Sequence, residues 1–239
     1  MAQFFNDPFL HAYNMRKLII IVFLFMGIVV GVAQENFKGY YEPYITLEYD
    51  VTENYSHGFT VEQRTIWYAD ESFTIDVTLL DLSHFSKMEL DDKNALAVGL
   101  QYRLEENFVT GEEDELRFTE EYTYTSKPNA IEFEHRLRTE QRITSSSTSH
   151  RFRYNFAITR SFKGPTIDTG QAYIMGDLET LLTVANTTKP EYEQRIGAGV
   201  GLVLSDSIKL ELVTEYRLTD FTQNLGHELF LVTGMKFTL

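Results

Sequence analysis

Charged side chains alternate with uncharged ones over several short segments, and they are the residues best suited to chemistry. Every second residue from Arg136 to Arg142 is charged, and Arg151 and Arg153 repeat the spacing after a serine-rich stretch. Residues two apart on an extended strand point to the same face, so these charges form a ladder. Such a ladder can fill a narrow interior with ion pairs, or bind small anions through bidentate guanidinium hydrogen bonds.

Two interpretations of the ladder remain open. In the first, paired charges plug a narrow barrel, and in the second, the arginines line a small anion-selective channel. We favour the first, because ~8 strands make a barrel filled by side chains and ~16–18 leave a channel. The residues predicted to line the interior are Arg103, Arg117, Arg136, Arg138, Glu140, Arg142, Arg151, Arg153, Asp177, Glu179, Arg195, Glu211, Glu215 and Arg217.

The elements that carry these charges are predicted to be β-strands. In Leu96–Glu105, for example, apolar and mostly polar positions alternate with a period of two, which is typical of a strand with one apolar face. The same analysis predicts eleven segments: Tyr44–Val51, Phe59–Tyr68, Phe73–Leu82, Leu96–Glu105, Leu116–Thr125, Ile131–Arg142, His150–Thr159, Tyr173–Thr183, Arg195–Leu204, Ile208–Arg217 and His227–Leu239.

The N-terminal region is predicted to be a cleaved secretory signal peptide, residues 1–33. Arg16 and Lys17 precede an apolar run, and Gly31-Val32-Ala33 supplies small residues at the cleavage site. The run is shorter than the ~20 residues of a spanning helix. Met15 is the expected true start. The mature chain, residues 34–239, is then one domain.

Alternation alone does not separate a membrane barrel from a secreted β-sandwich or a lipocalin-like barrel, because either face can be the outer one. The predicted strands run ~10 residues or more, which suits a tilted spanning strand better than the ~5–6 residues of a sandwich strand. Phe237 lies near the C-terminus, as in outer-membrane assembly signals. We therefore predict an all-β fold, a transmembrane antiparallel up-and-down β-barrel in the cell outer membrane. Its expected partners are outer-membrane lipid and the barrel-assembly machinery.

The strand count is predicted to be ten, with twelve as the alternative. Single-chain bacterial barrels have even numbers of strands and both termini in the periplasm, so one of the eleven segments must be reassigned. Either Tyr44–Val51 does not span, which leaves ten, or Asn36–Tyr41 or Phe85–Leu90 adds a twelfth. Counting back from the C-terminus places residues 205–207 in the periplasm, and residues 106–114, 144–149, 186–190 and 219–226 outside the cell.

Two hairpins have a predicted register. Pairing Leu204 with Ile208 keeps apolar residues opposite each other and sets Arg195 against Arg217. Pairing Arg142 with Arg151 places Glu140 opposite Arg153, with the polar faces again on one side.

The sequence also resembles a group of outer-membrane barrels of unknown function that are common in Bacteroidota. The resemblance rests on Arg136–Arg142 followed by His150–Tyr154, on Gly176–Glu179 as an acidic strand motif, and on Gln194–Gly201 as an arginine-containing glycine strand. It extends over about residues 94–239 and departs at Leu239, where the group usually ends on an aromatic residue. The resemblance implies an outer-membrane location and no established activity.

Other functions are disfavoured by composition. A net charge of −14 argues against nucleic-acid binding, and without cysteine no disulfide is possible. No spacing indicates a catalytic triad, a metal site or a cofactor, so we predict no enzymatic activity. The remaining alternative is an outer-membrane lipid hydrolase that uses His135 and His150 near Ser145–Ser147. Acidic residues 105–106 and 112–114 are expected to form a solvated loop, or to bind divalent cations.

Overall fold

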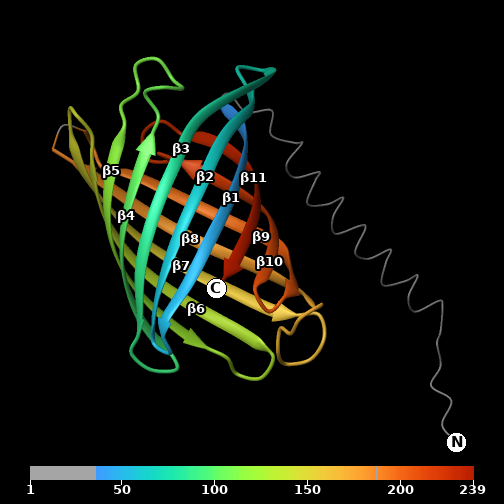
Figure 1. The fold of residues 1–239 in the computed structure, drawn as a ribbon. Coiled ribbons are helices and arrows are strands. Elements are labelled where there is room, and N and C mark those ends of the chain that lie inside the picture. Colours follow the sequence, from blue (N-terminus) through green and yellow to red (C-terminus); the bar gives the residue numbers. More distant parts are fainter. Residues whose placement is uncertain (1–35, 187) are drawn as a thin grey trace, which may run out of the picture. The chain divides into compact units, whose positions relative to one another are not determined.

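The structure is a computed structural model that describes residues 36–186 and 188–239. These residues form one closed β-barrel (Figure 1). The predicted signal peptide, with its expected start at Met15, lies outside them. No helix in the described part is long and apolar enough to cross a membrane. The strands are β1 (Phe37–Thr52), β2 (Tyr55–Ala69), β3 (Ser72–Glu89), β4 (Asn94–Leu104), β5 (Glu115–Ser126), β6 (Ile131–Ile143), β7 (Thr148–Ser161), β8 (Ala172–Ala185), β9 (Glu191–Ser205), β10 (Ile208–Thr219) and β11 (Gly226–Thr238).

The barrel of described residues has eleven strands, so the prediction of ten is wrong, and so is the alternative of twelve. Tyr44–Val51 lies within β1, and the proposed extra strand at Asn36–Tyr41 is the beginning of that same strand. Phe85–Leu90 is the last part of β3. The even-number rule assumes that every neighbouring pair is antiparallel, and this barrel closes with one parallel pair.

Closure joins β1 to β11 in parallel, from Phe37 opposite His227 to Glu48 opposite Thr238. The other neighbouring strands in Figure 1 are antiparallel, for example β1 with β2 and β10 with β11. Because β1 and β11 run the same way, β1 begins at one end of the barrel and β11 finishes at the other. We call these the N-terminal end and the C-terminal end.

The connections of the chain alternate between the two ends. The β4–β5, β6–β7, β8–β9 and β10–β11 loops lie at the N-terminal end, and the β9–β10 turn lies at the C-terminal end. The prediction that these four loops share one end is therefore confirmed. The prediction that both chain ends of the barrel lie together is wrong, since an odd number of strands separates them.

The structure confirms most of one predicted register and shows that the other is wrong. In the β9–β10 hairpin, Arg195 lies opposite Arg217 as predicted, although a bulge pairs Ile208 with Ser205 rather than with Leu204. In the β6–β7 hairpin, Glu140 lies opposite Arg151 and not opposite Arg153. The error is a shift of two residues, which changes the partners and leaves every side chain on its predicted face.

The sheet is polar inside and apolar outside. The carboxylates of Glu140 and Glu179 belong to residues that are only 4% and 3% exposed, whereas Ile45 is 55% and Val98 60% exposed. Exposed large apolar side chains occur on every strand. Alternation alone does not decide which face is the outer one, and the structure places the apolar face there, as predicted for a barrel with a charged interior.

Aromatic rings opposite glycines fill part of the interior. Phe85 is the direct cross-strand partner of Gly99, and Tyr173 is that of Gly201. In each pair the ring occupies the space that a Cβ on the glycine would need. These glycines are therefore required by a close approach, and the rings fill the interior toward the C-terminal end of the barrel.

Candidate functional site

A polar cavity of about 370 Å³ lies inside the barrel, toward the N-terminal end. Every side chain that lines it is polar or charged, and they come from all strands except β8. Among them are nine arginines and five carboxylates, a formal excess of four positive charges in a chain whose net charge is −14. Carboxylates just outside the lining, such as Glu115, Glu140 and Glu179, pair with several of these arginines, so the excess applies to the cavity surface alone.

The structure places the fourteen predicted interior residues on the inward face of the barrel, and most of them lie in or beside the cavity. Eight line the cavity: Arg103, Arg117, Arg138, Arg142, Arg151, Arg153, Arg195 and Arg217. The other six make polar contacts with inward side chains around it: Arg136, Glu140, Asp177, Glu179, Glu211 and Glu215.

One set of lining arginines is fully paired. Arg103 makes a bidentate contact with Asp81, with nitrogen–oxygen distances of 2.9 and 2.6 Å. Arg153 bridges two carboxylates, since its Nη1 lies 2.7 Å from Glu140 Oε1 and its Nη2 lies 2.7 Å from Glu179 Oε2. Buried charges need such partners, because an isolated ion loses its hydration without compensation.

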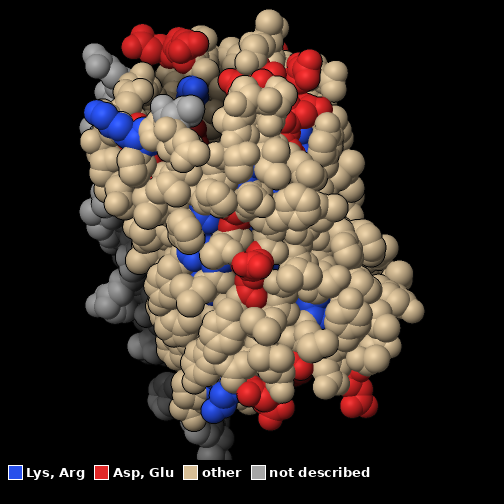
Figure 2. Space-filling model, turned by 90° about the vertical axis from the view of Figure 1, so that its left-hand side faces the viewer, with Lys and Arg blue, Asp and Glu red and all other residues tan. Residues whose placement is uncertain are grey.

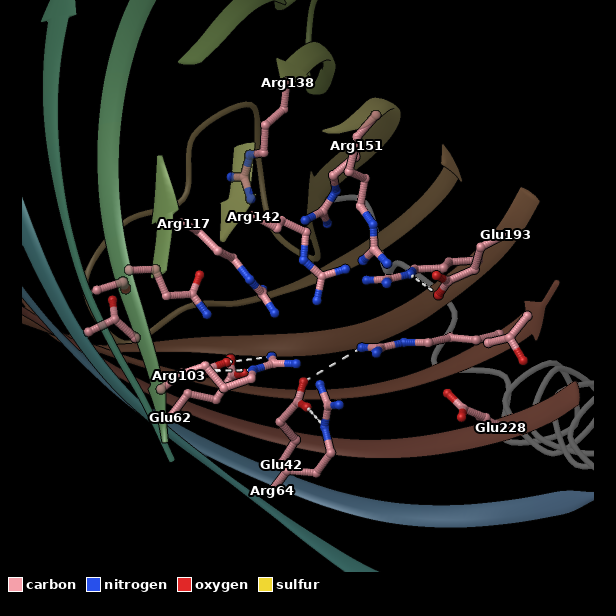
Figure 3. A pocket seen from close by; sticks show the side chains of 18 residues that line it. Glu42, Glu62, Arg64, Arg103, Arg117, Arg138, Arg142, Arg151, Glu193 and Glu228 are labelled. Carbon is pink, nitrogen blue, oxygen red and sulfur yellow. Dashed lines mark hydrogen bonds and ion pairs between the residues drawn. The ribbon is translucent and has the colours of Figure 1, made fainter. Parts of the chain in front are cut away.

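A second set lies on the neighbouring strands β5, β6 and β7 and is short of negative charge. Arg117 and Arg142 are direct cross-strand partners and share a single carboxylate, Glu115. Arg151 donates to the hydroxyl of Thr183 at 2.8 Å, and it forms no ion pair within the described residues. Figure 3 shows these three arginines on one side of the cavity. Three guanidinium groups thus have one carboxylate in direct ion pairs, a formal excess of two positive charges among these four residues, and Glu140, which pairs with Arg153, is the cross-strand partner of Arg151.

The opposite side of the cavity carries carboxylates that sequence reasoning missed. Glu42 pairs with Arg64 at 2.6 Å, and Glu62 and Glu228 also line the cavity (Figure 3). Glu42 was missed because the predicted first strand began two residues later. Glu62 and Arg64 stand two apart within a predicted strand, so period-two parity was the signal that could have found them.

A smaller polar cluster ties strands together on the C-terminal side of the cavity. Glu211 accepts hydrogen bonds from the hydroxyls of Tyr44 and Tyr173 and forms an ion pair with Lys236 at 3.0 Å. These residues belong to β10, β1, β8 and β11, so one carboxylate links both sides of the parallel closure.

The histidines that the sequence suggested for a hydrolase are not joined to a serine. His135 Nδ1 lies 2.9 Å from the hydroxyl of Tyr154, and the serines of the β6–β7 loop contact Glu113 instead. A serine–histidine contact does occur elsewhere on the outer face. Ser86 Oγ lies 3.1 Å from His57 Nδ1.

That Ser86 cluster lacks the other parts of a hydrolytic site. The same His57 Nδ1 also lies 3.0 Å from His84 Nε2, so the nitrogen that would take the serine proton is already shared. No carboxylate contacts either histidine among the described residues. Within the same residues, no group of three or more His, Cys, Asp or Glu side chains is arranged to hold a metal ion.

The acidic loop between β4 and β5 is fastened by its own carboxylates. Asp114 accepts the backbone N–H groups of Glu105 and Glu106 at 2.9 and 3.1 Å. Glu113 reaches the β6–β7 loop and accepts from Ser145 and from Ser146. The Ser145 hydroxyl, with smaller contributions from Thr144 and Ser146, lowers the pKa of Glu113 to about 2. The two loops are thus joined over the N-terminal end.

Comparison with protein families gives one match. The family described as "Protein of unknown function (DUF2490)" matches residues 44–227, well over half of the chain. The chain belongs to this family. The match runs from the middle of β1 to the second residue of β11. It includes β5, β6 and β7, which carry Arg117, Arg142 and Arg151. Neither the curated proteins nor the solved structures contain a significant match.

Proposed function

We propose that the protein is an outer-membrane β-barrel of a Gram-negative envelope, with a charged and mostly occluded interior and a structural or narrowly permeable role. The observation that carries this proposal is the polarity of the sheet. A water-soluble barrel buries its apolar face. Here Glu140 and Glu179 are buried while Ile45 and Val98 are exposed, as lipid surroundings require.

The outer surface of the barrel is also consistent with lipid surroundings. Figure 2 shows one face of the barrel, on which most acidic side chains gather at the two ends and the band between them is mainly uncharged, with one acidic group and several basic patches near its middle. Tyr41, Tyr49, Tyr102 and Tyr192 are exposed tyrosines of the kind found where a barrel meets the lipid headgroups. The strands, of 11 to 18 residues, are long enough to span.

The location follows from sequence features taken with this polarity. The predicted signal peptide would direct the chain across the inner membrane, and the resemblance to Bacteroidota barrels points to a Gram-negative outer membrane. The barrel-assembly machinery would then place the C-terminal end in the periplasm, so that the cavity lies on the outer side. Outer-membrane lipid is the partner of the apolar surface.

The ion-pair network of the interior supports narrow permeability. Contacts such as Arg103–Asp81 and Arg153–Glu179 fix long side chains between neighbouring strands inside the barrel. Eleven strands lie nearer to the ~8 of a filled barrel than to the ~16–18 of an open channel. A small anion-selective channel is the second candidate, favoured by the excess of arginines around the cavity.

The proposal assigns no enzymatic activity. The Ser86–His57 contact lies on a regular β-ladder, where neighbouring backbone N–H groups bond the adjacent strand and leave no donors for an oxyanion. Hydrolysis of phospholipid by the purified protein, lost in Ser86→Ala, would instead support the lipid-hydrolase alternative.

The test uses protein purified from outer membranes. Folded membrane barrels migrate faster than the boiled chain in detergent gels, so we expect a band that shifts on heating. The same sample is then placed in planar bilayers. A shift without conductance supports the occluded barrel, and discrete anion-selective steps support the channel. Soluble protein in the periplasm without a heat-dependent shift would contradict the proposal.

A further inference from the structure

The three arginines on β5, β6 and β7 form an unusual wall of the cavity. Arg117 and Arg142 oppose each other directly across two strands, and like charges in that position repel. Glu115 lies 2.8 Å from Arg142 and also contacts Arg117, so one carboxylate serves both. Arg151, on the next strand, has a hydroxyl partner and no carboxylate among the described residues. The wall therefore holds a formal excess of two positive charges.

The burial of Arg117 makes this excess costly. The residue is 7% exposed, and its Nη2 is, with Oε2 of Glu140, one of two buried side-chain atoms that have no hydrogen-bond partner within the described residues. A buried donor left without a partner costs about 1–3 kcal/mol. Natural proteins rarely keep such an atom unless something else occupies the place of its partner.

The surroundings of the wall suit a ligand. Arg117, Arg142 and Arg151 all line the cavity of about 370 Å³ and face it together (Figure 3). The cavity is larger than a tetrahedral oxyanion, and Glu62 and Glu228 on the opposite side could accept hydrogen bonds from hydroxyl groups.

We propose that this wall binds a doubly charged phosphate, either inorganic phosphate or a phosphate monoester, through Arg117, Arg142 and Arg151. Two negative charges balance the formal excess of the wall, and guanidinium groups offer paired donors that match phosphate oxygens. The site rests on the proposed function, because it names the ligand class of the barrel interior. It does not require that the ligand crosses the membrane.

The test measures binding to the purified full-length protein in detergent, by equilibrium dialysis with inorganic phosphate and with glycerol 3-phosphate at matched ionic strength in chloride. We expect saturable binding and a rise of about 2–8 °C in the unfolding temperature. Tighter binding of glycerol 3-phosphate identifies a monoester site, and equal binding identifies phosphate itself as the recognised group.

Three variants make the test specific. Arg151→Gln removes one hydrogen bond to Thr183 and should weaken phosphate binding at least about ten-fold. Arg117→Gln should weaken binding similarly, yet leave the unfolding temperature in phosphate-free buffer equal or higher, because it removes a like-charge pair while Glu115 keeps its ion pair with Arg142. Arg160→Gln changes an exposed arginine on the same strand as Arg151 and should bind as the wild type does.

The possible outcomes distinguish failure of the phosphate site from failure of the proposed membrane barrel. A heat-shifting band with no phosphate binding above that of chloride would overturn the site and leave the barrel intact. Unchanged affinity in Arg151→Gln would overturn it as well. Absence of the heat-dependent shift in the wild type would overturn the proposed function and the site together.

Discussion

Tyr44 of β1 and Gly234 of β11 are direct partners across the parallel pair that closes the barrel. The tyrosine ring occupies the space that a Cβ at position 234 would need, and its hydroxyl donates to Glu211 on β10. A glycine on one strand therefore admits a ring from the next, and that ring connects to a third strand. The closure depends on this packing as well as on backbone hydrogen bonds.

Gly234→Val should weaken the barrel at its closure. The added side chain must displace the Tyr44 ring, and overpacking of this kind costs typically about 1–3 kcal/mol. The free energy of unfolding, measured by urea titration of the detergent-folded protein, should fall by that amount. Gly58→Val is the matched control, because no atom lies within 4 Å of a Cβ built there. Equal losses in both variants would contradict the packing role of the tyrosine.

Arg153→Met should be more damaging than most surface changes. Its guanidinium pairs with Glu140 and Glu179, so its removal leaves two buried carboxylates with fewer partners. Breaking a buried ion pair by removing one partner costs about 3–5 kcal/mol. Arg153→Lys should lose less, because it keeps the charge. The exposed residue Arg160, changed to Met on the same strand, should alter the free energy of unfolding by about 0.5 kcal/mol or less.

The contact between Glu113 and the β6–β7 loop should persist at acidic pH. Since the Ser145 hydroxyl lowers the pKa of Glu113 to about 2, the contact is complete above the ordinary carboxyl pKa of about 4.3 and is lost as pH falls through about 2. Pepsin at about pH 3 should therefore cut the wild-type β4–β5 loop several-fold more slowly than that of Glu113→Gln.

The pepsin experiment includes its own control. Below about pH 2 the wild-type loop should be cut as fast as the variant loop, because Glu113 is then protonated in the wild type. Equal cleavage of the two proteins already at about pH 4 would show that the contact does not hold the loop.

The β-class of the fold and the common face of its charges could be predicted from periodicity, since side chains alternate strictly along a strand, and the strand lengths then favoured the inner face. The register of β9 and β10 could also be predicted, because a short turn at residues 205–207 allows few ways to pair the two strands. The β6–β7 loop is longer, and parity alone does not distinguish Arg151 from Arg153 as the partner of Glu140.

The sequence analysis found eleven segments, and the rule of even strand numbers replaced that count with ten, whereas the parallel closure and the cavity could not be predicted. Parallel pairing of β1 with β11 depends on contacts between the two ends of the barrel, which no local pattern records. The same holds for the wall of Arg117, Arg142 and Arg151. The sequence places these arginines on one face, but only the structure shows that Arg117 and Arg142 share Glu115 and that Arg151 contacts Thr183 instead.

The odd number of strands predicts an uncommon topology. If the C-terminal end lies in the periplasm, β1 begins at the cell surface. A short epitope inserted before Asn36 should therefore bind antibody on intact cells. Epitopes after Leu239 and in the β1–β2 turn at Asn54 should bind only after the outer membrane is permeabilised. Labelling of the first and second epitopes under the same condition would indicate an even number of spanning strands.

The most direct test of an eleven-stranded membrane barrel is a disulfide across its closure. Ile45 and Met235 are register partners on β1 and β11, and the chain has no cysteine of its own. Ile45→Cys with Met235→Cys should cross-link on mild oxidation in the outer-membrane fraction. Ile45→Cys with Leu229→Cys, six residues or roughly 20 Å away along β11, should not. If the first pair fails to link, or if the protein is recovered as a soluble periplasmic species, the closed membrane barrel is contradicted.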